Sequence, residues 1–160
     1  MSMLLDNLKD VEERIQAACD RSGRKREDVL LVAVSKTKPV EMIEEVMTAG
    51  IVDFGENKPQ ELRDKYEVLP KNLRFHMIGH LQTNKIKYMA PYVSMIHGID
   101  SYKLLAEVNK QAIKAERVIR CLLQIHIAQE ETKFGFSFDE CKEMLNAAEW
   151  KALANIQICG

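Results

Sequence analysis

Two spacings of apolar residues recur along the chain, and they predict different elements. In residues 4–18 the apolar positions fall three or four apart, which predicts a helix with one buried face, and Ser22 and Gly23 then end that pattern. The run VLLVAV at residues 29–34 is instead apolar at every position. Such a run is typical of a strand covered by helices on both faces. The chain is therefore expected to open with a helix and a buried strand.

The same alternation continues along the chain. Further apolar runs predict strands at residues 51–54, 74–78, 92–96, 118–127 and from 155 onward. Helical spacing predicts helices after Pro39, Asn57, Thr83, Ser101 and Ser137, and a capping box of Ser137 with Glu140 opens the helix 138–148. Strand and helix thus alternate every roughly 20–35 residues, which indicates parallel β/α units. A doubly wound sheet and a (β/α)8 barrel both fit this pattern. The first strand is not followed by G-x-G-x-x-G, which disfavours a dinucleotide-binding fold.

Polar residues follow the predicted strands at the point where each strand ends. They are Lys36, Glu56 with Asn57, His80, Asp100 and Lys133. In a parallel barrel the carboxyl ends of the strands meet at one face, and barrel enzymes build their sites there. We therefore expect these side chains to converge.

Lys36 has a position that suits a nucleophilic amine. An amine at the mouth of an apolar core loses hydration, which lowers the pKa of such a group and leaves more of it neutral. A neutral amine attacks an aldehyde to form a Schiff base, as in pyridoxal-phosphate proteins. The alternative is a strand-end lysine that extends into solvent. Lys38 is expected to point the same way along an extended chain, and Lys133 is either a second reactive amine or a loop charge.

Composition and charge narrow the class of protein. The chain has 160 residues, of which 46% are apolar and 29% charged, and this fits one globular domain over residues 1–160. A formal net charge of -1 gives no reason to expect nucleic acid or an anionic membrane as a partner. The longest apolar run is too short to span a bilayer. Without a signal peptide or Cys-x-x-Cys spacing, we expect a cytoplasmic protein with free thiols and no bound metal.

Four motifs together resemble one family. LLVAVSKTKP at residues 30–39, FGENKPQE at 54–61, FHMIGHLQTNK at 75–85 and ETKFGF at 131–136 are similar, in order and spacing, to the pyridoxal-phosphate homeostasis proteins. Those proteins resemble the barrel domain of alanine racemase without its second domain. The resemblance therefore implies an α/β fold of the (β/α)8 TIM-barrel type, with pyridoxal 5'-phosphate as cofactor.

The resemblance also implies site residues. Lys36 is then the lysine that forms the Schiff base. The expected cofactor-binding set is Lys36, Asn57, Ile78, Gly79, His80, Leu81 and Asn84. His80 is either a proton shuttle or a loop residue bonded to the main chain, and Asn84 is otherwise a helix cap. The family more often has tyrosine after the asparagine of FGEN, so Lys58 with Pro59 is a local departure at the helix start.

A cofactor site does not by itself imply catalysis. A racemase needs two acid–base groups on opposite faces of the substrate, and in alanine racemase the second is a tyrosine from the other domain. The tyrosines of this chain, at positions 66, 88, 92 and 102, do not follow a predicted strand. We therefore expect a protein of cofactor homeostasis without robust catalysis and without catalytic residues of its own. The alternatives are a weak amino-acid racemase or transaminase, and a barrel that binds another phosphorylated metabolite.

The number of strands points to an incomplete barrel. A (β/α)8 barrel typically takes about 250 residues, and phosphate sites follow its last two strands, whereas six strands are predicted here. The phosphate-binding residues are then expected beyond Gly160. Free strand edges favour pairing with another chain, so we expect the chain to self-associate and to hold the cofactor weakly, with free amino acids as further ligands.

Overall fold

A computed structural model describes residues 2–128 and 134–160, and these residues contain a parallel sheet of six strands. The strands are β1 (Ala33–Val34), β2 (Asp53–Glu56), β3 (Arg74–Met77), β4 (Met95–Ile99), β5 (Ile119–Leu123) and β6 (Ile156–Ile158). They lie in chain order from β1 at one edge to β6 at the other. A doubly wound sheet reverses its strand order, whereas a barrel does not. The arrangement is therefore that of an incomplete (β/α)8 barrel, as the sequence predicted.

Helices follow the strands. The longer ones are α1 (Met3–Ser22), α2 (Val40–Met47), α3 (Pro59–Val68), α4 (Tyr102–Lys114) and α5 (Phe138–Asn146), and the short 3-10 helices are η1 (Arg26–Asp28), η2 (Thr83–Tyr88) and η3 (Glu149–Ala152). The predicted end of α1 at Gly23 is confirmed, since that residue has φ 69°, a conformation that glycine adopts readily. The capping box of Ser137 with Glu140 is also confirmed.

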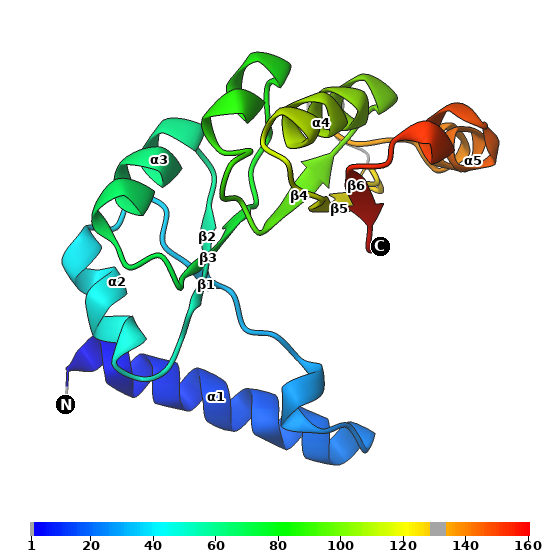
Figure 1. Ribbon diagram of the computed structural model, residues 1–160. Coiled ribbons are helices and arrows are strands. Elements are labelled where there is room, and N and C mark those ends of the chain that lie inside the picture. The colour runs from blue at the N-terminus through cyan, green and yellow to red at the C-terminus, as the bar shows by residue number, and fades with distance from the viewer. Residues whose placement is uncertain (1, 129–133) are drawn as a thin grey trace.

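One hydrophobic core lies between the sheet and its helices. In Figure 1, α2, α3 and α4 lie along the convex side of the curved sheet, and α1 packs against α2. Phe54 of β2 and Phe75 of β3 point into this layer with ring centroids 6.4 Å apart, and Leu62 of α3 is also buried in the same core. We call the opposite, concave side of the sheet its inner face.

The first strand is shorter than predicted. The apolar run 29–34 was expected to be buried on both faces, but only Ala33 and Val34 pair as a strand. Leu30 is 59% and Val34 is 53% exposed. The reason is that β1 is an edge strand and that α1 and α2 lie on one of its faces, so the apolar run did not mean burial on both sides.

Three other boundaries also differ from the prediction. The fourth strand spans Met95–Ile99 and not 92–96, because Tyr92 belongs to a turn after η2. The fifth ends at Leu123, beyond which Ile125 and Phe136 form an isolated bridge. The helix expected after Thr83 is the short η2, and its N-cap is Gln82. Asn84 is thus not the cap that its position suggested.

Candidate functional site

The carboxyl ends of β1, β2 and β3 bring three predicted site residues into one row. Ala33 pairs with Phe54, and Asp53 with Arg74, so each step to the next strand is 21 residues along the chain. The paired positions end at Val34 with Gly55 and at Glu56 with Met77, and the predicted site residues that lie one or two positions beyond them are Lys36, Asn57 and Ile78. Side chains in register on neighbouring parallel strands lie on the same face. Gly55 and Ile78 share the inner face, since a Cβ on Gly55 would lie 3.1 Å from the Ile78 Cδ1, whereas Lys36 belongs to the turn that follows β1.

Lys36 and Lys38 are separated by a turn. The Lys38 amide donates to the Ser35 carbonyl at 3.1 Å, and Thr37 between the lysines has φ 62°. The prediction that both lysines point the same way was therefore wrong, because the chain is not extended there. Lys36 is also exposed, and the partly buried position expected for its amine is not observed, since β1 is an edge strand with an open inner face.

A buried ion-pair cluster lies behind Lys36, on the helical side of the sheet. Lys65 of α3 donates from Nζ to the Glu56 Oε1 at 2.5 Å, to the Glu61 Oε1 at 2.8 Å and to the Ser35 carbonyl at 2.6 Å. Burial alone would raise the pKa of Glu61, but hydrogen bonds from Lys65 and from the Thr37 amide more than offset it and lower that pKa. Sequence reasoning missed Glu61 and Lys65, although their spacing of four on a helix marks an ion pair.

Asn57 and Gly79 pack directly on each other. A Cβ built on Gly79 would lie 2.7 Å from the Asn57 Cβ and 2.8 Å from its carbonyl oxygen, so glycine is required at this approach. The Oδ1 atom of Asn57 is buried without a hydrogen-bond partner. Buried polar atoms are almost always paired in native proteins. An unpaired acceptor beside the row that contains Lys36 fits a site that a polar ligand completes.

The other predicted residues lie in different surroundings. His80 is exposed, stacks on Phe134 with ring centroids 3.6 Å apart, and has its Nδ1 at 3.5 Å from a carboxylate oxygen of Asp100. The Leu81 side chain is 2% exposed and belongs to the core. Asn84 is exposed on η2. Lys133 lies outside the described residues.

A second polar cluster lies on the inner face, towards the amino ends of the strands. Asp53 accepts from Arg74 Nε at 2.9 Å and Nη2 at 2.6 Å, and its Oδ1 lies 2.9 Å from the His76 Nε2. The His76 Nδ1 in turn lies 2.9 Å from the His97 Nε2. Burial and the charge of His76 lower the pKa of His97. These contacts within the protein indicate a structural role for both histidines.

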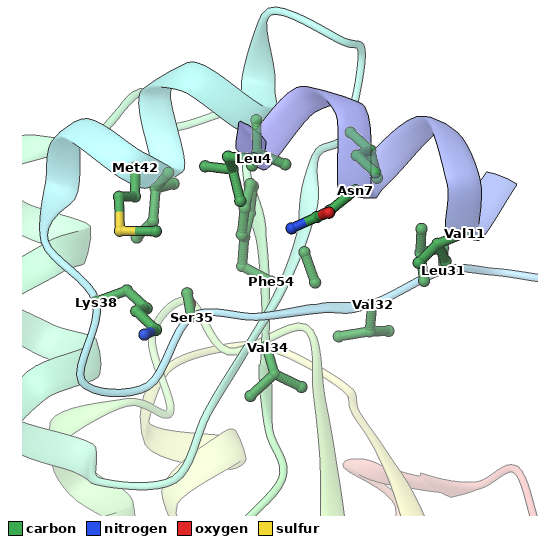
Figure 2. Close-up of a pocket in the computed structure, with 14 residues that line it drawn as sticks. Leu4, Asn7, Val11, Leu31, Val32, Val34, Ser35, Lys38, Met42 and Phe54 are labelled. Carbon is green, nitrogen blue, oxygen red and sulfur yellow. The ribbon is translucent and has the colours of Figure 1, made fainter. Parts of the chain in front are cut away.

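A cavity of about 320 Å³ lies between α1, β1 and α2 (Figure 2). Its lining is largely apolar, with Leu4, Leu31, Met42 and Phe54 pointing into it beside Ser35 and Lys38. Figure 2 shows Val34 pointing away from Ser35 and Phe54, which places the cavity on the opposite side of β1 from the inner face. It contains none of the seven predicted cofactor-binding residues. The cavity is therefore not the predicted site.

The described residues contain neither a metal-ligand cluster nor a membrane-spanning helix. Over residues 2–128 and 134–160, no group of three or more His, Cys, Asp or Glu side chains could hold a metal ion. Within the same ranges, no helix has the length and apolar character needed to cross a membrane. The four cysteines are free, and Cys159 alone among them is exposed.

Comparison with known proteins gives consistent matches. The family model described as alanine racemase, N-terminal domain, matches residues 7–160. The chain is 39% identical over 156 residues to the pyridoxal phosphate homeostasis protein of Aquifex aeolicus (strain VF5), covering 97% of this chain and 68% of that protein. It is 37% identical to the Escherichia coli (strain K12) protein of the same name, covering 92% of this chain and 64% of that one. The chain thus spans about two thirds of these curated relatives.

A solved structure is similar as well. PipY of Synechococcus elongatus PCC7942, determined with PLP bound, aligns with a TM-score of 0.76 at 28% identity, covering 91% of this chain and 68% of that one.

Proposed function

The chain belongs to the alanine racemase N-terminal-domain family and, within it, to the pyridoxal phosphate homeostasis proteins, and from this premise we propose that it binds pyridoxal 5'-phosphate through Lys36. Its role is then cofactor homeostasis, in which the cofactor is held without robust catalysis. The bound cofactor in the similar PipY structure supports this assignment.

The observation that carries the proposal is the row at the carboxyl edge of the sheet. Lys36, Asn57 and Ile78 follow the ends of three neighbouring strands, and the Lys36 side chain is exposed. Pyridoxal phosphate, when bound, would supply an aldehyde group, which is the group that a lysine amine holds covalently. Lys36 provides that amine, and the unpaired Asn57 Oδ1 accepts a hydrogen bond from the ligand.

Reductive labelling tests this assignment. The chain is incubated with pyridoxal phosphate and borohydride, and the labelled lysine is identified by peptide mapping. We expect the label on Lys36 and none in Lys36→Ala. Lys38→Ala is the matched control, because Lys38 belongs to the same turn but lines the cavity on the other side of β1, and it should be labelled like the parent. Label mainly on Lys38 or Lys133 would overturn the proposal.

Weak catalysis follows from the positions of two tyrosines that would otherwise offer a second base. Tyr66 and Tyr92 stack face to face, with ring centroids 3.8 Å apart, and burial raises the pKa of Tyr92 to about 12. A buried phenol with so high a pKa is a poor base at neutral pH. We expect exchange of the alanine α-proton in D2O to stay far below ordinary enzyme rates. Fast exchange that is lost in Lys36→Ala would show that a second base exists.

Further parts of the proposal concern partners and location. Free amino acids are proposed as further ligands, whereas nucleic acid and membranes are not proposed as partners. The cytoplasm is the proposed compartment.

Within the described residues β1 and β6 each have one neighbouring strand, and such edges favour pairing between chains. We therefore propose self-association, which light scattering on the purified chain measures. A monomer at all concentrations would contradict it.

A further inference from the structure

The geometry points to Lys65, with Glu56 and Glu61, as the positioning apparatus of Lys36, an inference that rests on the proposed function. Two peptide groups flank Lys36, and a charged side chain of this cluster holds each of them. The Ser35 carbonyl accepts from Lys65 Nζ at 2.6 Å. The Thr37 amide donates to Glu61 Oε1 at 2.6 Å.

All three hydrogen-bond donors of the Lys65 ammonium are used within this cluster. An ammonium group has three donors, and those of Lys65 go to Ser35, Glu56 and Glu61. Lys65 is 6% exposed and Glu56 is 0% exposed. A buried ammonium needs paired charges to offset its desolvation, and the two carboxylates provide them. Because each donor already has a partner, Lys65 is not itself a free amine for a ligand.

The segment around Lys36 needs such support. β1 pairs with its neighbour through two residues and lies at an edge, so few ladder hydrogen bonds fix the chain beyond Val34. Thr37 has φ 62°, a conformation that costs free energy for a residue with a branched Cβ and persists only where the surroundings impose it. The hydrogen bond from its amide to Glu61 is one contact that imposes it.

The cluster also holds the turn that contains Lys36. The Ser35 hydroxyl donates to the Glu56 Oε1 at 2.7 Å, which fixes Ser35 towards the helices. Lys36 belongs to the turn that this hydrogen bond and the bonds to the Ser35 carbonyl and the Thr37 amide hold in place, so the cluster fixes the main chain from which the Lys36 side chain extends. Lys65, Glu56 and Glu61 therefore act through the main chain, as positioning residues that touch neither the amine nor a ligand.

The test compares variants that remove the cluster with controls on the same helix. Glu61→Ala removes the anchor of the Thr37 amide, and Glu67→Ala, at an exposed position of α3, is its control. Lys65→Met leaves Glu56 as a buried unpaired charge and risks unfolding. The double variant Glu56→Gln with Lys65→Met removes both charges and keeps the side-chain volumes. Its control is Arg63→Met with Asp64→Asn, which removes an exposed ion pair of the same helix.

Two measurements are made on each folded variant. The first is hydrogen exchange of the Thr37 amide in the ligand-free chain, and the second is the rate at which pyridoxal phosphate with cyanoborohydride labels Lys36. Loss of a hydrogen bond to a charged group is worth roughly a factor of ten in such rates, or about 1.4 kcal/mol. We expect Lys36 labelling to fall by about that factor in Glu61→Ala and in the double variant. Thr37 exchange should rise by about that factor in Glu61→Ala, which removes the acceptor of the Thr37 amide. Both controls should match the parent.

The outcomes separate this inference from the proposed function. If the parent chain is not labelled at Lys36, the proposed function fails. If the parent is labelled and the folded Glu61→Ala and double variants are labelled equally fast, the positioning role is refuted. Melting curves show whether each variant is folded, and a purely structural ion pair would lower the melting temperature without changing the Lys36 labelling rate of the folded chain.

Discussion

Replacing Asp53 by asparagine tests the polar cluster on the inner face. Asp53 is 3% exposed, and its carboxylate accepts from Arg74 and lies 2.9 Å from the His76 Nε2. Burial by itself raises the pKa of Asp53, but the hydrogen bonds from Arg74 and His76 outweigh it and lower that pKa. Asparagine keeps the volume, loses the charge and leaves one acceptor oxygen where there were two.

The expected loss of stability follows from the exposure of the two partners. A hydrogen bond to a charged group contributes about 1.5–3 kcal/mol, and the bond to His76 counts in full because that side chain is 3% exposed. The Arg74 side chain is 54% exposed, so water replaces much of its contact, which contributes about 0–1 kcal/mol. Asp53→Asn should therefore lower the free energy of unfolding by roughly 2–4 kcal/mol.

Equilibrium unfolding in urea, followed by circular dichroism and by the fluorescence of Trp150, measures this loss. Asp64→Asn is the matched control, since the ion pair of Asp64 with Arg63 is exposed and its loss should cost less than about 1 kcal/mol. A lowered pKa means that Asp53 stabilises the fold above its ordinary value of 3.8 and that this contribution disappears as the pH falls through the folded pKa. A loss in Asp53→Asn no larger than in the control would refute the reasoning.

Gly79→Ala should destabilise the fold by about 1–3 kcal/mol in a thermal melt, because its Cβ would lie 2.7 to 2.9 Å from Asn57, and Gly160→Ala, with 3.5 Å to its nearest atom, should be neutral. Burial, together with the neighbouring imidazole, lowers the pKa of His97 from 6.5, so the contribution of His97 to stability is complete above pH 6.5 and is lost as the pH falls through the folded pKa. The urea midpoint of His97→Gln should therefore lack this loss of stability at low pH. If the variant loses stability over the same pH range as the parent, another group is responsible. Cys159 should react at once with a thiol reagent, while the three buried cysteines react only on unfolding; four equally fast thiols would contradict the burial.

Periodicity was sufficient to predict the β/α alternation and the parallel sheet. The apolar face of α1 and its C-cap at Gly23 are local features, and local features can be predicted from local sequence. The ends of β1 and β4 were not predictable in this way. Whether Val34 is covered depends on what lies across the inner face, and the start of β4 at Met95 depends on how η2 turns the chain.

Side-chain contacts that depend on strand register could not be predicted from the sequence either. The motif around Glu56 and Asn57 drew attention to the asparagine, while the structure shows that the glutamate anchors a buried lysine nine residues later. Asp53, His76 and His97 come from three different strands, and their contact becomes visible only when the strand offsets are known. Leu81 was expected to contact the ligand because it belongs to the motif FHMIGHLQTNK. In the structure its side chain packs in the core.

The unbroken strand order has a consequence for how the chain folds during synthesis. Each strand pairs with the strand that precedes it in the sequence. Every new β/α unit can therefore add to a strand that has already been synthesised. Loop closure over one unit costs less than closure over the whole chain, and contacts between near neighbours in sequence form quickly. The α1–β2 region is therefore expected to gain structure first on the ribosome, and the sheet to grow in one direction from it.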